Sequence, residues 1–244
     1  MSRYDNFLVK AIKNGYLGIT QDKKVADKLF INFCNEEYSL EKTNLSIITL
    51  YPVDYLKIYE NIVYMLGNNK YSRSDFNYVF KKEQIDKLLL IKEHPEKDYV
   101  LNLYNPKTKK VIKGKELHFV LEGKRLHVNL MQASTNLYRV DAIDKLKYSI
   151  LVNILCNVLD LKPGKFIQQT TRAYVKKADL SNMRNITART PRNTMNLEFI
   201  IKEKIKDIRN IDPSIFKLVN YTPCVGNLDF EKAYMKKYNA KYDI

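Results

Sequence analysis

The chain is poor in the residues that define several large classes of protein. Its three cysteines, Cys34, Cys156 and Cys224, are too few and too scattered for a disulfide framework. Three histidines, at positions 94, 118 and 127, give no metal-ligand spacing, so no metal site is expected. Tryptophan is absent, and the seven glycines and seven prolines are too dispersed to mark an interdomain linker. A disulfide-stapled, zinc-stabilised or linker-divided protein is therefore excluded.

Long apolar runs are also lacking. No segment approaches the roughly 18 to 20 apolar residues of a membrane span, and residues 1–20 lack the apolar core of a signal peptide. We therefore expect a cytoplasmic protein without a membrane partner, in the host cytoplasm if a phage or virus encodes it. The 244 residues are 45% hydrophobic and 11% aromatic, enough to bury a core. This composition excludes disorder and predicts one globular domain.

The chain has a large excess of basic residues. It carries 42 Lys+Arg against 27 Asp+Glu, for a net charge of +15, and residues 162–206 alone hold eleven basic and three acidic side chains. Only nine of the basic residues are arginine, so the excess predicts general attraction to polyanions more than specific recognition. A solubilising surface together with AT-rich codon usage explains the same composition, and both interpretations stay open.

Hydrophobic periodicity predicts an α+β domain. Helical spacing is found over 53–66, ending at Gly67, over 83–93 and over 141–159, with a short helix or turn at 178–183. Strand patterns occupy 98–104, 117–121, 126–132, 165–175, 196–201 and 215–220. Residues 122–125 join the second and third of these strands as a hairpin. We expect all six strands in one mixed or antiparallel sheet that packs on the 141–159 helix.

Three motifs in the second half of the chain resemble thymidylate synthase. Residues 158–167 (V-L-D-L-K-P-G-K-F-I), 189–192 (R-T-P-R) and 216–223 (F-K-L-V-N-Y-T-P) match the family's L-K-P-G-x-F-I, R-x-P-R and Y-x-P. From Asp144 to Arg192 the sequence aligns with the family pattern without a gap. The resemblance therefore implies a thymidylate synthase-like mixed sheet packed with helices.

Motifs nearer the N-terminus agree with this resemblance. Residues 131–134 (M-Q-A-S) are similar to the family's Y-Q-R-S. Residues 94–98 are similar to its N-P-x-S-R-R, and residues 104–106 are similar to its W-N-P. Residues 64–69 resemble the end of the family's tryptophan-containing helix. The likeness covers roughly 50–230, so we assign 51–244 to the family core. Residues 1–50 form a diverged N-terminal segment of the same domain and lack the phosphate-binding loop.

The resemblance implies a chemistry for which the expected nucleophile is missing. Thymidylate synthases and deoxycytidylate hydroxymethylases add a cysteine thiolate to C6 of the pyrimidine, and methylenetetrahydrofolate then supplies a one-carbon unit. Family spacing places Ile112 at the nucleophile position, and no cysteine lies between residues 35 and 155. Cys156 is predicted to be a buried structural thiol. Cys224, near the end of the Y-x-P strand, is the remaining catalytic candidate.

Other site positions carried over from the family are partly replaced. Gln132 and Ser134 are retained, and the D-A-H-x-Y motif that binds the sugar becomes residues 172–176, which include Arg172 and Tyr174. Asp144 stands where an asparagine reads uracil, as in the deoxycytidylate hydroxymethylases. The simpler interpretation is an acid in the first turn of a helix, favoured by the helix macrodipole. The anion-binding candidates are Lys97, Lys176, Arg189 and Arg192, of which Lys97 would serve the partner's site.

Two functional hypotheses from different classes remain. The first is a pseudoenzyme that needs no cofactor and acts as a basic binding or scaffold protein. It would form a homodimer and hold nucleic acid, a nucleotide or an acidic protein across the ancestral cleft. The alternative is an active methyltransferase or hydroxymethylase that acts on dUMP or dCMP with methylenetetrahydrofolate. A cysteine sulfur facing the site would favour the alternative.

Overall fold

The computed structural model describes residues 8–9, 11–13, 16–17, 28–43, 45, 47–138, 140–192 and 197–238. Its centre is a seven-stranded sheet in the order β1-β2-β7-β6-β5-β4-β3, antiparallel throughout except for the parallel pair β6 and β7. The strands are β1 (Tyr16–Leu17), β2 (Lys28–Ser39), β3 (Val79–Phe80), β4 (Tyr99–Asn105), β5 (Lys110–Glu122), β6 (Arg125–Asn136), β7 (Lys162–Lys176), β8 (Glu198–Ile201) and β9 (Phe216–Val219). The helices are α3 (Leu40–Thr43), α4 (Tyr55–Met65), α5 (Lys82–Leu89), α6 (Val140–Leu159), α7 (Leu180–Thr187) and α8 (Asp229–Tyr238), with the 3-10 turns η1 (Asn69–Tyr71), η2 (Lys177–Asp179) and η3 (Pro213–Ile215).

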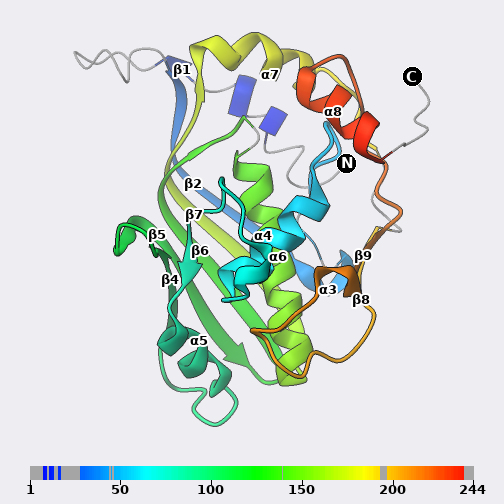
Figure 1. Ribbon diagram of the computed structural model, residues 1–244. Helices are drawn as coiled ribbons and strands as arrows, with labels where there is room; N and C mark the ends of the chain where they lie inside the picture. The colour runs from blue at the N-terminus through cyan, green and yellow to red at the C-terminus, as the bar shows by residue number, and fades with distance from the viewer. Residues whose placement is uncertain are drawn as a thin grey trace.

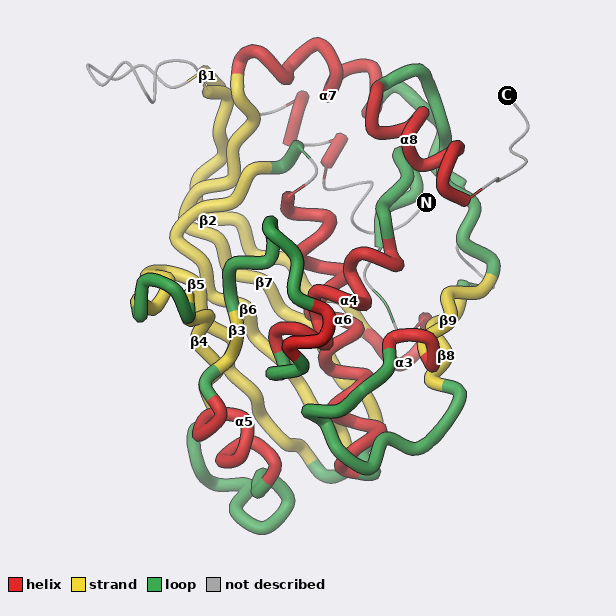
Figure 2. The backbone as a smooth tube through the Cα atoms, viewed as in Figure 1, coloured by secondary structure: helices red, strands yellow, loops and turns green. Residues whose placement is uncertain are grey.

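Helix α6 is the centre of the core. It packs on β6 and β7 on one side and on α4 on the other, so it lies between the sheet and α4 (Figures 1 and 2). Leu146, Ile150 and Ile154 are at most 1% exposed, as their four-residue spacing predicts for a buried stripe. We call the sheet face that α6 covers the inner face and the opposite one the outer face. The predicted helix at 141–159 and its packing on the sheet are confirmed.

Local signals placed most other elements correctly. The 122–125 hairpin joins β5 to β6, and Gly123 at its turn has φ +58°, a conformation that glycine adopts without strain. Helix α4 ends before Gly67, which has φ +106°. The strand predicted after Pro163 and Gly164 is β7, which begins at Lys162. These α+β features agree with a single domain of mixed sheet and helices.

The expected position of two strands was wrong. The segments predicted at 196–201 and 215–220 form β8 and β9, which pair only with each other in a separate two-stranded sheet. The reason is packing: Phe199 and Phe216 bury their rings against Tyr59 of α4, at centroid distances of 5.9 and 5.4 Å, instead of extending the main sheet. Residue 196 lies outside the described residues. Strand β2 and helix α8 were not predicted.

The outer face of the main sheet carries exposed apolar side chains, and β2 is kinked at Phe33, which has no partner in the register with β7. Phe33 in β2 has φ +54° and is 83% exposed, although the left-handed region is unusual for a bulky residue. Val120 in β5 and Met131 in β6 are 58% and 42% exposed.

Among the described helices, none combines the length and apolar character needed to cross a lipid bilayer.

Candidate functional site

The sequence-predicted residues Gln132 and Asp144 are both neighbours of Lys115, which is opposite Gln132 in the strand register and forms an ion pair with Asp144 at the start of α6. Strand register places Lys115, Gln132, Thr170 and Cys34 in one row across β5, β6, β7 and β2. Gln132 is 5% exposed, and its Nε2 donates to Thr170 Oγ1 at 2.9 Å. Within the described residues its Oε1 has no hydrogen-bond partner. Asp144, in the first turns of α6, lies over this row of side chains.

Asp144 is held by two lysines. Its carboxylate forms ion pairs with Lys115 from β5 and with Lys147 from the next turn of α6, the latter at 2.8 Å. Burial alone would raise the pKa of Asp144, but the ammonium groups of Lys115 and Lys147 overcome this effect and lower the pKa to about 2. The carboxylate is therefore ionised at neutral pH, and both of its oxygens are engaged.

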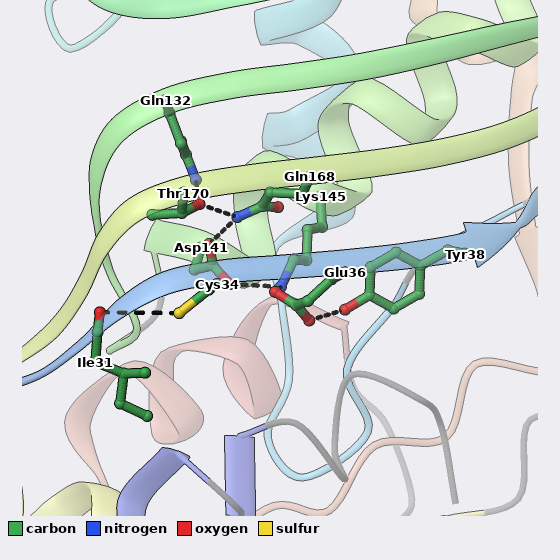
Figure 3. A network of polar contacts seen from close by, with 9 residues as sticks. All are labelled: Ile31, Cys34, Glu36, Tyr38, Gln132, Asp141, Lys145, Gln168 and Thr170. Carbon is green, nitrogen blue, oxygen red and sulfur yellow. Dashed lines mark hydrogen bonds and ion pairs between the residues drawn. The ribbon is translucent and has the colours of Figure 1, made fainter.

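A second set of buried charges lies beside the first (Figure 3). Lys145, whose side chain is 1% exposed, places its Nζ 2.7 Å from Glu36 Oε1 and 2.7 Å from Asp141 Oδ2. Gln168 Nε2 donates to the other oxygen of Asp141 at 2.8 Å, and Tyr38 donates to Glu36. Burial raises the pKa of Glu36, although Lys145 opposes the shift.

Together these groups form what we call the ion cluster: Lys115, Lys145 and Lys147 with Glu36, Asp141 and Asp144. Three ammonium groups face three carboxylates, so the charges cancel when all six are ionised. A buried ion pair tolerates loss of one member poorly because the other is left uncompensated. Each charge of the cluster is paired with another charge of the cluster. A ligand that entered the space between α6 and the inner face would have to break one of these ion pairs.

The cysteines do not offer a reactive thiolate to this region. Burial raises the pKa of Cys156 to about 12. Burial, with the nearby carboxylates of Glu36 and Asp141, raises that of Cys34 to about 11. Cys224 is half-buried, with Sγ 3.1 Å from the Thr190 carbonyl oxygen. With pKa values raised this far, the thiols of Cys34 and Cys156 are protonated at neutral pH and poorly nucleophilic.

Cys34 joins the inner-face row because β2 pairs with β7, a pairing that no motif in the sequence indicated. It therefore lies on the face of the sheet that carries Gln132, the position that favours the catalytic alternative, but its raised pKa keeps the thiol protonated. Ile112, the residue at the family's nucleophile position, lies in β5 and packs against the core as a half-buried side chain. No group of three or more histidine, cysteine or carboxylate side chains within the described ranges could hold a metal ion.

The other predicted substrate residues lie beyond the kink, where β2, β6 and β7 leave α6. Ser134 is adjacent to Arg172, and Tyr174 is opposite Phe30, so alternation places Ser134, Arg172, Tyr174 and Lys176 on one face. The Arg172 guanidinium lies 5.1 Å from the Phe30 ring centroid, and the Lys28 ammonium lies 4.3 Å from the Tyr174 centroid. Lys28 is directly opposite Lys176.

We call Lys28, Arg172 and Lys176, with Tyr174 between them, the basic strip. None of its three cations is ion-paired within the part of the chain that the structure describes. Like charges directly opposite each other on paired strands repel. The strip therefore offers positive charge and an aromatic ring to an anionic group.

Two of the predicted anion-binding arginines have structural partners. Arg189 donates to the Leu50 carbonyl oxygen at 3.1 Å and forms a two-pronged ion pair with Glu231 of α8, which is fully buried. The backbone N–H of Arg192 donates to Thr49 Oγ1 at 3.1 Å, and the Thr49 hydroxyl donates to the Arg192 carbonyl oxygen at 3.3 Å. Arg189 thus fastens α8 to the core, and this engagement argues against the predicted role in anion binding.

Lys97 is not brought together with the other candidates within one protomer. It lies in the loop between α5 and β4, at the end of the molecule opposite α7 (Figure 1). The resemblance assigns this position to the partner's site, so its role stays a prediction. Sequence reasoning missed Lys28, whose strand it did not predict, and Lys115 and Lys147, which it counted only as general charge.

Comparison with known proteins places this chain in a family. A family model described as thymidylate synthase matches residues 77–233, well over half of the chain. The chain belongs to the thymidylate synthase family.

Two relatives illustrate the distance within that family. A thymidylate synthase of human herpesvirus 8 type P (isolate GK18) is 27% identical over 140 residues, which is 55% of this chain and 41% of the relative. A thymidylate synthase of Saccharomyces cerevisiae (strain ATCC 204508 / S288c) is 25% identical over 176 residues, 70% of this chain and 51% of the relative. The chain thus spans about half the length of the curated relatives it matches.

Proposed function

We propose that this protein is a non-catalytic member of the thymidylate synthase family that works as a basic binding or scaffold protein. The observation that carries the proposal is the ion cluster, above all the pairing of Asp144 with Lys115 and Lys147. The resemblance puts the pyrimidine beside Gln132 and Asp144. Here that space is held by charges that neutralise each other, so a pyrimidine would compete with a buried ion pair.

The state of the thiols supports the same proposal. Adding a nucleophile to C6 requires a thiolate within bonding reach of the ring. The pKa values of Cys34 and Cys156 are raised to about 11 and 12, and Ile112 occupies the position that family spacing gives to the nucleophile. A protein built this way needs no methylenetetrahydrofolate.

We propose that the ligand is a nucleic acid or nucleotide bound on the basic strip. Three cations without ion-pair partners neutralise phosphates, and the exposed edge of Tyr174 contacts a base. Because each neutralised phosphate releases counterions, the affinity should fall steeply with salt. Sequence preference should be weak, since phosphate contacts carry no base information.

The binding test compares two double variants that change the net charge equally. R172E/K176E reverses two cations of the strip, whereas K92E/K107E reverses two exposed lysines elsewhere. Titration with single- and double-stranded nucleic acid, dUMP and dCMP at about 0.15 M salt should show at least a tenfold loss for the first variant only. Equal losses would mean that charge acts without regard to position, which favours an acidic protein partner or a solubilising coat.

The catalytic alternative is tested in the same protein. Incubation with dUMP or dCMP and methylenetetrahydrofolate at neutral pH should give no methylated or hydroxymethylated product. Turnover that disappears in Cys224→Ala would overturn the proposal and identify the protein as a one-carbon transferase with an unusual nucleophile.

We further propose that the protein is a homodimer joined through the outer face. Phe33, Val120 and Met131 give that face exposed apolar area, and a hollow of about 520 Å³ beside Phe33 is lined by Gly114 and Ala133. Phe33→Asn removes the apolar ring while suiting the positive φ, so it should give a monomer by light scattering. Leu90→Asn, at a 43% exposed residue away from the sheet, should leave the dimer intact.

A further inference from the structure

The outer face of the main sheet carries a carboxylate whose ion-pair partner changes charge with pH. Glu116 in β5 is half-exposed, and within the described residues its one ion-pair partner is His118, with Nε2 3.2 Å from Glu116 Oε2. We call these two residues the outer-face pair. A carboxylate only accepts hydrogen bonds, so His118 Nε2 carries the hydrogen of this contact. The imidazole becomes a cation only when a second proton binds at Nδ1, and histidine takes up such a proton between about pH 8 and pH 5.

The outer-face pair lies inside the exposed apolar area of the sheet. Val120 follows His118 by two residues in β5, so both side chains point to the same face. Met131 of β6 is opposite Glu116 in the strand register. A second copy that packs on Val120 and Met131 must therefore also cover the outer-face pair, which loses water when the homodimer forms.

Among the described residues, the other charged groups near the outer-face pair supply no cation to it. In β4, Val100 is opposite His118, and the acid beside this strand is Asp98, one residue before its start. The cations that β6 and β7 place on this face already have carboxylate partners: Arg125 with Glu41 at 3.0 Å, and Lys165 with Glu37 at 3.2 Å. The counter-charge for the carboxylate of the pair must therefore come from its own histidine.

His127, the second histidine on this face, makes a hydrogen bond that only a neutral imidazole can make. It precedes Asn129, the residue opposite His118, by two positions in β6. Its Nδ1 accepts from the Lys165 backbone N–H at 3.2 Å, and its Nε2 lies 3.4 Å from Glu122 Oε2. A proton at His127 Nδ1 would break the backbone hydrogen bond. No described residue makes a hydrogen bond with His118 Nδ1, so His118 gains a proton without losing a contact.

We propose that the outer-face homodimer is a pH switch in which His118 is the sensor. When two protomers associate, each takes up one proton from solvent at His118 Nδ1. The buried carboxylate of Glu116 then faces an imidazolium, whereas a neutral imidazole would leave it uncompensated. The imidazolium is thus more stable in the dimer than in the monomer, so the dimer gains affinity as the pH falls through the histidine range and loses it as the pH rises. This inference rests on the proposed homodimer and assigns its regulation.

The pH dependence is measured by fluorescence-detected sedimentation of the full chain at about pH 8, 6.5 and 5.5 and constant ionic strength. The Kd of the dimer should fall at least about tenfold from pH 8 to pH 5.5, because dimer formation consumes a proton at each of the two His118 side chains. Far-UV circular dichroism at each pH checks that the protein stays folded. An equal Kd at the three pH values, or a weaker dimer at the lowest pH, overturns the proposal.

Three conservative variants identify the sensor. Glu116→Gln removes the charge that needs a partner, so its dimer at pH 8 should be at least about tenfold tighter than that of the wild type and should change little with pH. His118→Gln cannot bind the proton, so its Kd should stay near the wild-type value at pH 8 throughout the range. His127→Gln, the matched control on the same face, should retain the pH dependence. A dependence that survives in Glu116→Gln or His118→Gln, or that disappears in His127→Gln alone, overturns the assignment.

Failure of the homodimer and failure of the switch give different results. A monomer at every pH contradicts the homodimer itself and removes the switch with it. A dimer whose Kd does not change with pH keeps the homodimer and removes only the switch.

Discussion

The ion cluster and the basic strip use the same two strands in opposite ways. Strand β2 supplies Glu36 to the cluster and Lys28 to the strip. Strand β7 supplies Gln168, which donates to Asp141 of the cluster, and Lys176 of the strip. Where α6 covers the sheet, each charge of the ion cluster has a partner. Beyond the kink, where α6 no longer covers it, like charges stand opposite each other. Burial thus decides which charges must be matched.

This contrast follows from the cost of removing ions from water. A buried charge without a partner costs several kcal/mol, whereas an exposed charge is solvated and screened. Unmatched cations are therefore tolerable only on the strip, and there they remain free for a ligand. The cluster, in contrast, stabilises the region that the family uses for substrate. The same sheet thus separates a region whose charges are matched from one whose cations are unmatched, where we propose that the ligand binds.

The largest effect should come from removing the central lysine of the cluster. Lys145→Met leaves Glu36 and Asp141 facing each other with no cation between them, so we expect a loss of about 3 to 5 kcal/mol in the free energy of unfolding. Urea denaturation at pH 7 measures this loss. The matched control is Lys165→Met, which removes a half-exposed ion pair with Glu37 and should cost at most about 1 kcal/mol.

Restoring neutrality should recover part of the loss. In the triple variant K145M/E36Q/D141N no net charge is buried, so it should be more stable than Lys145→Met alone. Similar losses for the two methionine variants would mean that the cluster is hydrated and no different from the surface.

Acid should weaken the cluster at a defined pH. Asp144 has its pKa lowered from 3.8 to about 2, so its stabilising contribution is complete above pH 3.8 and is lost as the pH falls toward 2. We expect this residue to account for about 1 kcal/mol of lost stability between pH 6 and pH 3, and about 2 kcal/mol by pH 2. Asp144→Asn should remove that part of the pH dependence in denaturation curves. An unchanged pH profile would show that the pairing with Lys115 and Lys147 does not persist in solution.

Some of this organisation could be predicted from sequence because its signals are local. The apolar stripe of α6 and the glycine turn between β5 and β6 depend on residues a few positions apart. The resemblance assigned Asp144 and Gln132 to one site, and both are neighbours of Lys115 in the structure. The resemblance left two interpretations of Asp144 open, a residue that reads the pyrimidine and an acid in the first turn of a helix. Neither interpretation included the ion pair with Lys115, which lies 29 residues earlier, in β5.

The rest depends on partners distant in sequence. Glu36 finds Lys145 across 109 residues, and its strand carries too many polar side chains to read as buried. Arg189 was interpreted as an anion ligand because it belongs to the R-T-P-R motif and to the basic segment 162–206. Its partner Glu231 lies 42 residues later in α8, a helix that was not predicted. Charge pairing between distant elements therefore has no local signature, and unassigned cations were taken for ligand-binding groups.

The smallest effect on stability, and the sharpest test of the contrast, should come from Lys176. It lies directly opposite Lys28, and opposed like charges destabilise a strand pair. Lys176→Glu converts the repulsion into an attraction, so the free energy of unfolding should rise by about 0.2 to 1 kcal/mol while nucleic-acid affinity falls. Lys92→Glu, at an exposed residue outside the strip, should change neither by as much. The free energy of unfolding rises while the nucleic-acid affinity falls only if the unpaired cations of the strip lower stability and also bind the ligand. If Lys176→Glu weakened both folding and binding, Lys176 would have a buried or paired role, and the division between matched and unmatched charge would fail at this residue.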